Sequence, residues 1–375
     1  MTAAKTRLPS YVYDLSIIGT VGLPASYGGF ESLAEQLARR LSVQWRVQVF
    51  CSGKKYPAGI PRPAQSDGAD LAYVEWDANG WQSMLYDFIS LWRSARQSRS
   101  LLVLGVSGCL LLPLIRLLWP QTRIITNVDG LEWKRRKWGR LARTILRISE
   151  WAAVRFSHAV VADNQGIREH IAGTYDCDSH LIAYGGDQAI TSLIDLPSGD
   201  TCYERWSYYL MICRIEPENH IKEILQCFAS TPQERIVVVG NWASSKYALD
   251  LRISFSNAPN IELKDPIYDQ ARLRLLRQGA KACVHGHSAG GTNPSLVEAM
   301  FAGMAVLAFD VDYNRHTTKN QAAYWQHADE LLSCLRESTP QVLQQNAAAM
   351  ARIARTSYTW AGVTAQYASV LSPKN

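Results

Sequence analysis

The 375-residue sequence lacks the patterns that mark several common protein classes. Its eight cysteines are scattered singly, with no CxxC pair and no Cys/His cluster, so neither a disulfide framework nor a zinc site is predicted. No Ser/His/Asp nucleophile set is present, which argues against a triad hydrolase. The chain has no low-complexity polar tract, so a disordered protein is excluded. We expect reduced cysteines, most of them small core residues.

A large excess of charge is also missing, because the net charge is only +6 over the whole chain. This composition does not demand a nucleic-acid partner. The first residues lack the apolar run of a signal peptide, and we therefore expect a cytoplasmic protein. The composition that is present, 47% hydrophobic and 19% charged, is typical of globular proteins, and the length predicts two domains.

One apolar stretch, residues 101–120, is long enough to raise the question of a membrane-spanning helix. It is interrupted by two glycines, a proline and an arginine: Gly105, Gly108, Pro113 and Arg116. A buried strand at 101–105, a glycine turn and a buried helix explain the same residues. We favour this interpretation over a transmembrane helix.

Short β-branched runs alternate with amphipathic stretches, a pattern typical of parallel sheets wrapped by helices. The first series predicts strands at 13–20, 46–50, 71–76, 123–128 and 158–162, with a helix at 30–41. The second series predicts strands at 208–213, 235–240, 261–264, 282–286 and 305–310. We therefore predict two doubly wound α/β domains that meet at residues 195/196 and face a cleft, where such sheets bind ligands.

The clearest chemical motif is HGHSAGGTNPSLVEAM, residues 285–300. It follows a predicted strand and opens a helix, so backbone N–H groups and the helix dipole favour an anion there. The motif predicts a diphosphate cradle made by His287, Gly290, Gly291, Thr292 and Asn293. Glu298, one turn into the helix, is suited to accept hydrogen bonds from a sugar hydroxyl. The alternative is a carboxylate that only favours the helix dipole.

This motif resembles the nucleotide-sugar-binding domain of GT-B glycosyltransferases, in the large retaining group called family four. In that family two glutamates eight positions apart flank the loop and the helix start. Glu298 matches the second, whereas Gly290 stands in place of the first, which contacts the donor sugar in the family.

A second family element is a strand ending in Gly-Arg with a lysine soon after, whose cations hold the donor diphosphate. It is matched by MICRIEPENHIKEIL, residues 211–225. Arg214 matches the arginine, a fork suited to phosphate oxygens, with a surface ion pair as the alternative. Asn219, followed by His220, stands where the lysine is expected, and either side chain would replace it by hydrogen bonding.

These departures resemble a bacterial subgroup typified by β1,4-rhamnosyltransferases of capsule, O-antigen and cell-wall rhamnan synthesis. The N-terminal half agrees, because IIGTVGLPASYGGFESLAEQLA and NVDGLEWKRRKWGR resemble the same subgroup. The resemblance implies a GT-B fold with an acceptor domain (1–195), a nucleotide-sugar domain (196–356) and a returning helix (357–375). It also implies retaining transfer of L-rhamnose from dTDP-β-L-rhamnose to a polyprenyl-diphosphate-linked saccharide, without metal or other cofactor.

Two N-terminal loops supply further candidate residues. The G-x-G-x-x-G spacing fails in GTVGLPASYGGFE, which disfavours a plain oxidoreductase. Gly28, Gly29 and Glu31 are predicted to bind donor or acceptor, with a tight turn and a helix-dipole glutamate as an equal alternative. Asp129 and Glu132 are predicted to face the cleft. Asp129 would act as general base or orient the sugar, or else form an Asx turn.

Cations and tryptophans are interleaved over residues 134–155, a pattern of membrane-surface patches. Nucleic acid would use similar charge, but no recognised nucleic-acid fold accompanies it. An ordinary solvated helix face is the alternative. The residues predicted to contact the acceptor or an anionic membrane are Glu132, Trp133, Lys134, Arg135, Arg136 and Trp138. The expected location is therefore the inner face of the cell membrane.

Three other functions stay open on sequence grounds. The donor sugar could be another hexose carried by UDP or GDP. A sugar-nucleotide epimerase shares the two-domain architecture, although it needs neither a lipid acceptor nor a basic tryptophan patch. A binding protein without catalysis is also possible, because Gly290 and Asn219 replace the expected groups.

Overall fold

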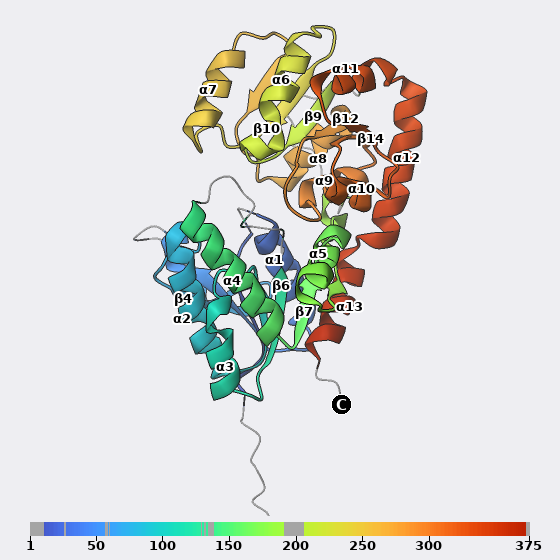
Figure 1. The fold of residues 1–375 in the computed structure, drawn as a ribbon. Helices are drawn as coiled ribbons and strands as arrows, with labels where there is room; N and C mark the ends of the chain where they lie inside the picture. The colour runs from blue at the N-terminus through green and yellow to red at the C-terminus, as the bar shows by residue number, and fades with distance from the viewer. Residues whose placement is uncertain are drawn as a thin grey trace, which may run out of the picture. The chain divides into compact units, whose positions relative to one another are not determined.

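The computed structural model describes residues 11–25, 28–56, 59, 61–128, 130, 133, 139–190 and 206–372. The chain forms two compact units. Unit 1 comprises Met1–Asp163, Ile167–Ile182 and Thr364–Asn375, and unit 2 comprises Asn164–Gly166 and Ala183–Val363. Each unit is an α/β domain built on one mainly parallel sheet (Figure 1).

Unit 1 has an eight-stranded sheet of order β3-β4-β2-β1-β5-β6-β7-β8, parallel except for the β3–β4 pair. The strands are β1 (Tyr13–Ile18), β2 (Val47–Ser52), β3 (Gln65–Ser66), β4 (Ala69–Val74), β5 (Ser98–Leu104), β6 (Arg123–Val128), β7 (Ala159–Ala162) and β8 (His180–Leu181). The helices are α1 (Gly29–Leu41), α2 (Ser83–Ala95), α3 (Leu112–Leu118), α4 (Arg140–Phe156) and α5 (Gln165–Tyr175). Short 3-10 turns are η1 (Gly53–Lys55), η2 (Gly80–Gln82) and η3 (Cys109–Leu111).

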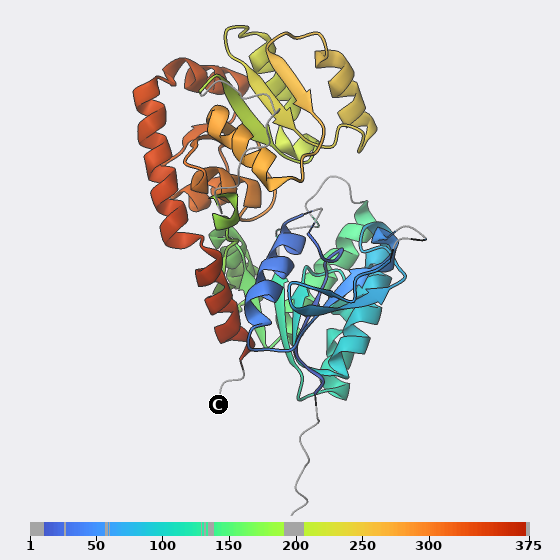
Figure 2. The same ribbon diagram turned by 180° about the vertical axis from the view of Figure 1, so that it is seen from behind.

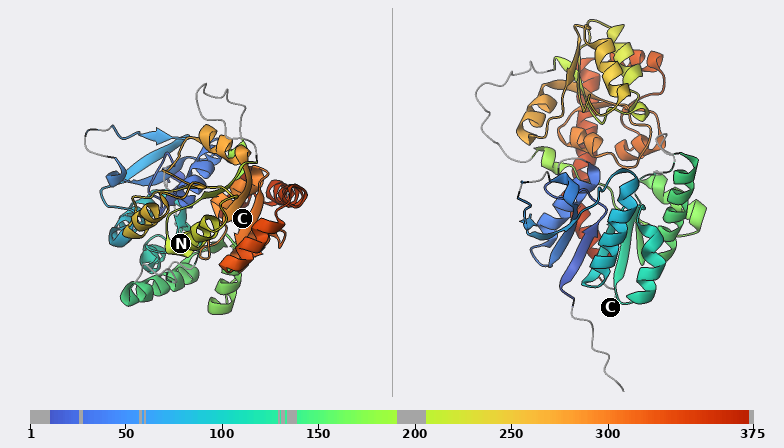
Figure 3. Two further views of the ribbon diagram at one scale, coloured as in Figure 1. Left: turned by 90° about the horizontal axis from the view of Figure 1, so that it is seen from above. Right: turned by 90° about the vertical axis from the view of Figure 1, so that its left-hand side faces the viewer.

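The central strands of unit 1 are covered on both faces, as the right-hand view of Figure 3 shows. All six residues of β2 are buried, and so are six of the seven in β5. Such strands read as continuous apolar runs because helices remove both sides of the sheet from water. The chain goes from β1 to β2 and β4 on one side and continues at β5 on the other. The topological switch point of this sheet therefore lies between β1 and β5.

Unit 2 has a six-stranded parallel sheet of order β11-β10-β9-β12-β13-β14. The strands are β9 (Tyr208–Ile212), β10 (Ile236–Val239), β11 (Ile261–Lys264), β12 (Ala280–His285), β13 (Ala305–Phe309) and β14 (Ala323–Trp325). The helices are α6 (Ile221–Ala229), α7 (Lys246–Phe255), α8 (Gln270–Gly279), α9 (Pro294–Phe301), α10 (Asp312–Thr318), α11 (Ala328–Glu337) and α12 (Pro340–Ser357). The last helix, α13 (Trp360–Leu371), begins in unit 2 and belongs to unit 1 from Thr364 onward. The 3-10 turns are η5 (Asp187–Ile190) and η6 (Pro217–Asn219).

Alternate residues of the unit 2 strands contribute their side chains to two hydrophobic cores, one on each face of the sheet. Met211 and Val238 pack with α6, α7 and α11, whereas Leu210 and Val239 pack with α8, α9 and α12. Figure 2 shows the long α12 continuing into α13 at the end of the chain. The switch point of this sheet lies between β9 and β12, because β10 and β11 follow on one side and β13 and β14 on the other.

The structure agrees with the predicted α/β fold and with a strand at each predicted place. Residues 101–120 form the end of β5, η3 and α3, and among the described residues no helix is long and apolar enough to cross a bilayer. The predicted burial of α3 is only half right. Leu112 and Ile115 are buried, but Leu117 is 76% exposed, because the helix lies on the outside of the unit.

The predicted domain boundary at 195/196 falls outside the described residues, whereas residues 183–190 already belong to unit 2. Close packing explains this, since a Cβ on Gly185 would lie 2.4 Å from the Trp360 ring and one on Gly186 would lie 2.7 Å from Val297. All seven described cysteines are free, and four are buried, as predicted for core thiols: Cys51, Cys109, Cys227 and Cys283.

Candidate functional site

The sequence motifs of the C-terminal half meet at the switch point of unit 2. Strands β9 and β12 are parallel neighbours, so the loops that leave their carboxyl ends start side by side. The loop after β9 carries Arg214 and Asn219, and the loop after β12 carries the glycine-rich segment 286–293. In doubly wound sheets this is where ligands bind.

These two loops are locked together. A Cβ on Gly286 would lie 2.2 Å from the Asn219 carbonyl oxygen, so only glycine allows this approach. Ser288 donates two hydrogen bonds to the Glu218 carbonyl oxygen, from its backbone N–H at 3.0 Å and from its hydroxyl at 2.9 Å. The Asn219 amide nitrogen donates to the Arg214 carbonyl oxygen at 2.7 Å. The backbone of both loops is thereby held in one arrangement.

Asn219 is 2% exposed, and its amide donor is used inside the protein. In this structure it positions the backbone of Arg214, and a direct contact with a donor phosphate stays a prediction. His220 adopts a left-handed conformation, with φ 50°, and stacks on Phe309 with ring centres 4.0 Å apart. The Arg214 side chain is 47% exposed and lies 3.6 Å from Glu216. Such an exposed ion pair contributes little to stability.

The first turn of α9 is shaped as the sequence predicted. Asn293 caps the helix by accepting from the Ser295 backbone N–H at 3.0 Å and from the Ser295 hydroxyl at 2.8 Å, and Pro294 is the first helical residue. Gly290 has φ +128°, and a Cβ there would meet open space. The absence of a glutamate at this position therefore leaves room beside the loop. His287, Gly291 and Thr292 lie in the same connection.

Glu298 is held by a polar network that the sequence did not reveal. The Arg277 guanidinium on α8 pairs with Glu298 Oε2, and Gln188 Nε2 donates to Glu298 Oε1 at 2.7 Å. Gln188 in turn accepts from the indole N–H of Trp360 at 2.5 Å. The Arg277 side chain is 2% exposed and that of Glu298 is 17% exposed. The glutamate is thus aimed by a buried cation.

Arg277 could have been noticed from its position in α8. It follows Leu273 and Leu276 at helical spacing, so it falls on the apolar stripe of the helix. An arginine is rarely buried unless it is paired. The sequence cannot name its partner, because Glu298 is 21 residues away.

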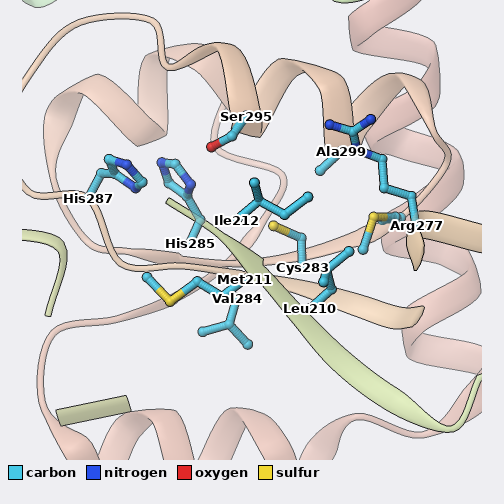
Figure 4. A pocket seen from close by; sticks show the side chains of 11 residues that line it. Leu210, Met211, Ile212, Arg277, Cys283, Val284, His285, His287, Ser295 and Ala299 are labelled. Atoms are coloured by element: carbon cyan, nitrogen blue, oxygen red, sulfur yellow. The ribbon is translucent and has the colours of Figure 1, made fainter. Parts of the chain in front are cut away.

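A small pocket lies along the inner side of α9, lined in part by Arg277, His285, His287 and Ser295 (Figure 4). The two histidine rings are stacked, with centres 4.3 Å apart. Burial lowers the pKa of His285 to about 3, so this imidazole is neutral. Asn314 donates to the His287 carbonyl oxygen at 2.9 Å and fixes that backbone. The ring of His287, a predicted ligand residue, is therefore held by stacking on the neutral ring of His285, and its backbone is held by Asn314.

The predicted loop residues of unit 1 have a clear structural role. Glu31 is 4% exposed and accepts from the Val21 backbone N–H at 2.8 Å and from the Thr20 hydroxyl at 3.2 Å. A Cβ on Gly28 would lie 3.0 Å from the Glu31 carboxylate, and α1 begins at Gly29. Glu31 thus shapes the β1–α1 loop, and a ligand contact by these three residues stays a prediction.

The described part of the basic segment lies on α4, which packs beside α3, so that the exposed sides of the two helices adjoin (Figure 1). We call this the α3–α4 face. Its exposed apolar side chains are Leu114, Leu117, Leu118, Leu141, Ile148 and Trp151. The exposed arginines on the same helices are Arg116, Arg140, Arg143, Arg147 and Arg155.

Trp133 packs against α4. Its indole N–H donates to Glu150 at 2.9 Å, and the Arg147 guanidinium lies 4.8 Å from its ring centre. Several predicted residues lie outside the described part of the chain: Asp129, Glu132, Lys134, Arg135, Arg136 and Trp138. Within the described ranges, no three His, Cys, Asp or Glu side chains are grouped as metal ligands would be.

Comparison with protein families matches each half of the chain separately. Residues 12–187 match a domain of unknown function, DUF1972, and residues 203–328 match glycosyl transferases group 1. The chain carries a group 1 glycosyl transferase domain. That domain contains both interlocked loops and Glu298. No curated protein matches the chain.

Solved structures confirm the GT-B fold of this glycosyltransferase. Sucrose-phosphate synthase from Thermosynechococcus elongatus is 13% identical, with a TM-score of 0.76, over 95% of this chain and 97% of that one. A UDP-forming α,α-trehalose-phosphate synthase from Burkholderia xenovorans is 11% identical, with a TM-score of 0.70, over 95% and 99%. A glycosyltransferase from Rickettsia africae is 10% identical, with a TM-score of 0.66, over 95% and 97%.

Proposed function

We propose that this glycosyltransferase transfers L-rhamnose from dTDP-β-L-rhamnose to a polyprenyl-diphosphate-linked saccharide, with retention and a β1,4 linkage. The observation that carries the proposal is the pair of interlocked loops at the β9–β12 switch point. They combine an open glycine turn, a capped helix start and a half-exposed arginine head, which together suit a diphosphate. The same loops carry the motifs that resemble rhamnosyltransferases.

Each donor-site residue has a defined task in this proposal. The backbone amides of residues 290–292 and the Arg214 guanidinium hold the diphosphate as it leaves, which stabilises the developing charge. Asn219 fixes the Arg214 backbone, and His287 and Asn293 border the cradle. Glu298, aimed by Arg277, accepts hydrogen bonds from donor hydroxyls. The task needs no cofactor.

We propose that the protein binds its acceptor at the inner face of a bacterial membrane. The α3–α4 face combines apolar side chains with five arginines, a combination that favours an anionic lipid surface. A polyprenyl-linked acceptor lies in such a surface. We propose that Asp129 orients the acceptor sugar, that Gly28, Gly29 and Glu31 shape its binding loop, and that the segment 132–138 contacts the acceptor or the membrane.

The test is a panel of nucleotide sugars incubated with bacterial lipid extract and scored for release of the nucleoside diphosphate. We expect dTDP-rhamnose to be the best donor, and we expect Arg214→Ala and Glu298→Ala each to lower turnover about 100-fold. Arg235→Ala is the control, because its exposed pair with Glu262 lies at the amino ends of the strands.

Other outcomes would identify other functions. A UDP- or GDP-sugar that exceeds dTDP-rhamnose would change the donor. Turnover with a soluble sugar phosphate and none with lipid would replace the lipid acceptor, as the names of the sucrose- and trehalose-phosphate synthases suggest. A new nucleotide sugar formed from donor alone would indicate an epimerase. Full activity in both variants would remove the site assignment.

A further inference from the structure

The segment YGGDQ, residues 184–188, packs against both α9 and the start of α13. A Cβ on Gly186 would lie 2.7 Å from the Val297 side chain and 3.1 Å from the backbone nitrogen of Glu298, both in α9. A Cβ on Gly185 would lie 2.4 Å from the ring of Trp360, the first residue of α13. The two glycines therefore let one short segment bring the donor-site helix and Trp360 together.

Hydrogen bonds fix the Trp360 indole against this segment. Asp187 accepts from the Trp360 backbone N–H at 2.6 Å, and the Gly186 backbone N–H donates to the Tyr358 carbonyl oxygen at 3.0 Å. Trp360 is 1% exposed, so its ring is enclosed by protein. Its indole N–H donates to Gln188 Oε1 at 2.5 Å. The enclosed ring thus has its N–H directed at Gln188.

The indole decides which end of the Gln188 amide meets Glu298. An indole N–H donates and cannot accept, so the Gln188 atom that faces it is the carbonyl oxygen. The amide nitrogen then faces the other way, and it donates to Glu298 Oε1 at 2.7 Å. The hydrogen bonds from Trp360 to Gln188 and from Gln188 to Glu298 therefore run in one direction.

Both oxygens of Glu298 accept from the protein and keep capacity for a ligand. Gln188 donates to Oε1, and Arg277 donates to Oε2. Each carboxylate oxygen has a second position at which it can accept a hydrogen bond. The Glu298 side chain is 17% exposed, so a ligand can reach it. Because the protein supplies only donors, what Glu298 offers to a ligand is an acceptor, and a hydroxyl is the matching group.

We propose that Gln188 and Trp360 are positioning residues that fix Glu298 as the acceptor for a hydroxyl of the nucleotide-sugar donor. Gln188 holds one carboxylate oxygen, and Trp360 keeps the Gln188 amide from turning its own oxygen toward that carboxylate. All three residues belong to unit 2, so their effect is on binding of the donor. This inference rests on the proposed function.

The experiment measures Kd by calorimetry for the best donor of the panel and for its free nucleoside diphosphate. Gln188→Met removes both amide groups at similar length, and we expect it to raise the donor Kd about tenfold. Trp360→Phe removes the N–H that orients the amide and should raise it by a smaller factor. In a Glu298→Ala background, Gln188→Met should cause no further rise, because the residue that it positions is gone. A rise for the free diphosphate as well would locate the bound hydroxyl on the nucleotide, and a rise for the sugar nucleotide alone would locate it on the hexose.

Gln321→Met is the matched control, because it removes an amide of unit 2 whose oxygen accepts from the exposed Arg352 at 3.0 Å. It should keep the wild-type Kd, and thermal unfolding shows that each variant is folded. If Gln188→Met raises the Kd equally with and without Glu298, its effect is a general one on the fold and the positioning role is overturned. Wild-type Kd in both Gln188→Met and Trp360→Phe overturns it too. If the wild-type protein binds no nucleotide sugar of the panel, the proposed function fails and this inference fails with it.

Discussion

At the scale of single residues, the ion pair of buried Arg277 with Glu298 has a large expected energetic consequence. Removing one partner of a buried ion pair leaves an uncompensated charge, whereas replacing both with neutral groups is much less costly. Glu298 has a second donor in Gln188, but an amide does not neutralise its charge. The stability of unit 2 and the aim of the proposed donor-site carboxylate therefore depend on the same arginine.

We expect Arg277→Met to lower the free energy of unfolding by about 3 kcal/mol, because the mostly buried Glu298 carboxylate loses its cation. The double variant Arg277→Met with Glu298→Gln should lose less than the sum of the single variants. Urea denaturation of the four proteins in this cycle measures the coupling. Arg252→Met is the control, because its exposed pair with Asp265 should change stability by about 0–1 kcal/mol. Strict additivity in the cycle would contradict the pairing.

At the scale of elements, α4 illustrates how one helix serves two environments. Leu146, Ala153 and Glu150 face the interior, where Glu150 accepts from His170 and Tyr175 at 2.8 and 2.7 Å. The opposite stripe carries Ile148 and Trp151 toward solvent. A helix with this apolar outer stripe and flanking arginines is suited to lie on a membrane surface.

We expect Ile148→Glu with Trp151→Glu to weaken binding to phosphatidylglycerol vesicles at least tenfold, because apolar area is lost and negative charge is added near anionic lipid. Vesicle sedimentation measures the binding, and thermal unfolding checks that the fold persists. Ile253→Glu on α7 replaces a side chain that is 73% exposed in unit 2 and should leave binding unchanged. Equal binding of all three proteins would count against the membrane role of the α3–α4 face.

At the scale of the whole molecule, the end of the chain belongs to the unit where the chain began. Residues 364–375 are part of unit 1. Asn127 Nδ2 donates to the Tyr367 hydroxyl at 2.8 Å, Arg123 donates to the Val370 carbonyl oxygen at 3.0 Å, and Ser100 donates to that of Leu371 at 3.2 Å. Unit 1 is therefore stabilised in part by residues 364–375, which follow unit 2 in the sequence.

We expect Tyr367→Phe to lower the stability of unit 1 by about 1–3 kcal/mol, because the buried Asn127 amide loses its acceptor. Hydrogen exchange should show faster exchange in β5 and β6, with β9 and β12 unchanged. Tyr268→Phe, at a side chain that is 68% exposed, is the control. Loss of protection in unit 2 instead would show that Tyr367 acts elsewhere.

The sequence by itself determined the α/β class, the places of the strands and the position of the glycine-rich turn before α9. These features are local, because alternating apolar patterns, a Pro at the helix start and glycines in a turn are encoded by neighbouring residues. It also predicted that Arg214 and Glu298 share one site, since parallel strands bring the loops at their carboxyl ends together.

Only the tertiary structure decided which side chains touch. Arg277 reaches Glu298, Gly286 meets Asn219, and Ser107 bonds to Asp87 across 20 or more positions of sequence. The exposure of side chains was also decided by the tertiary structure. The sequence of a leucine-rich helix such as α3 does not tell whether another part of the protein covers its outer face. Contacts between distant segments and the exposure of an outer helix face are set by tertiary packing, which no local pattern records.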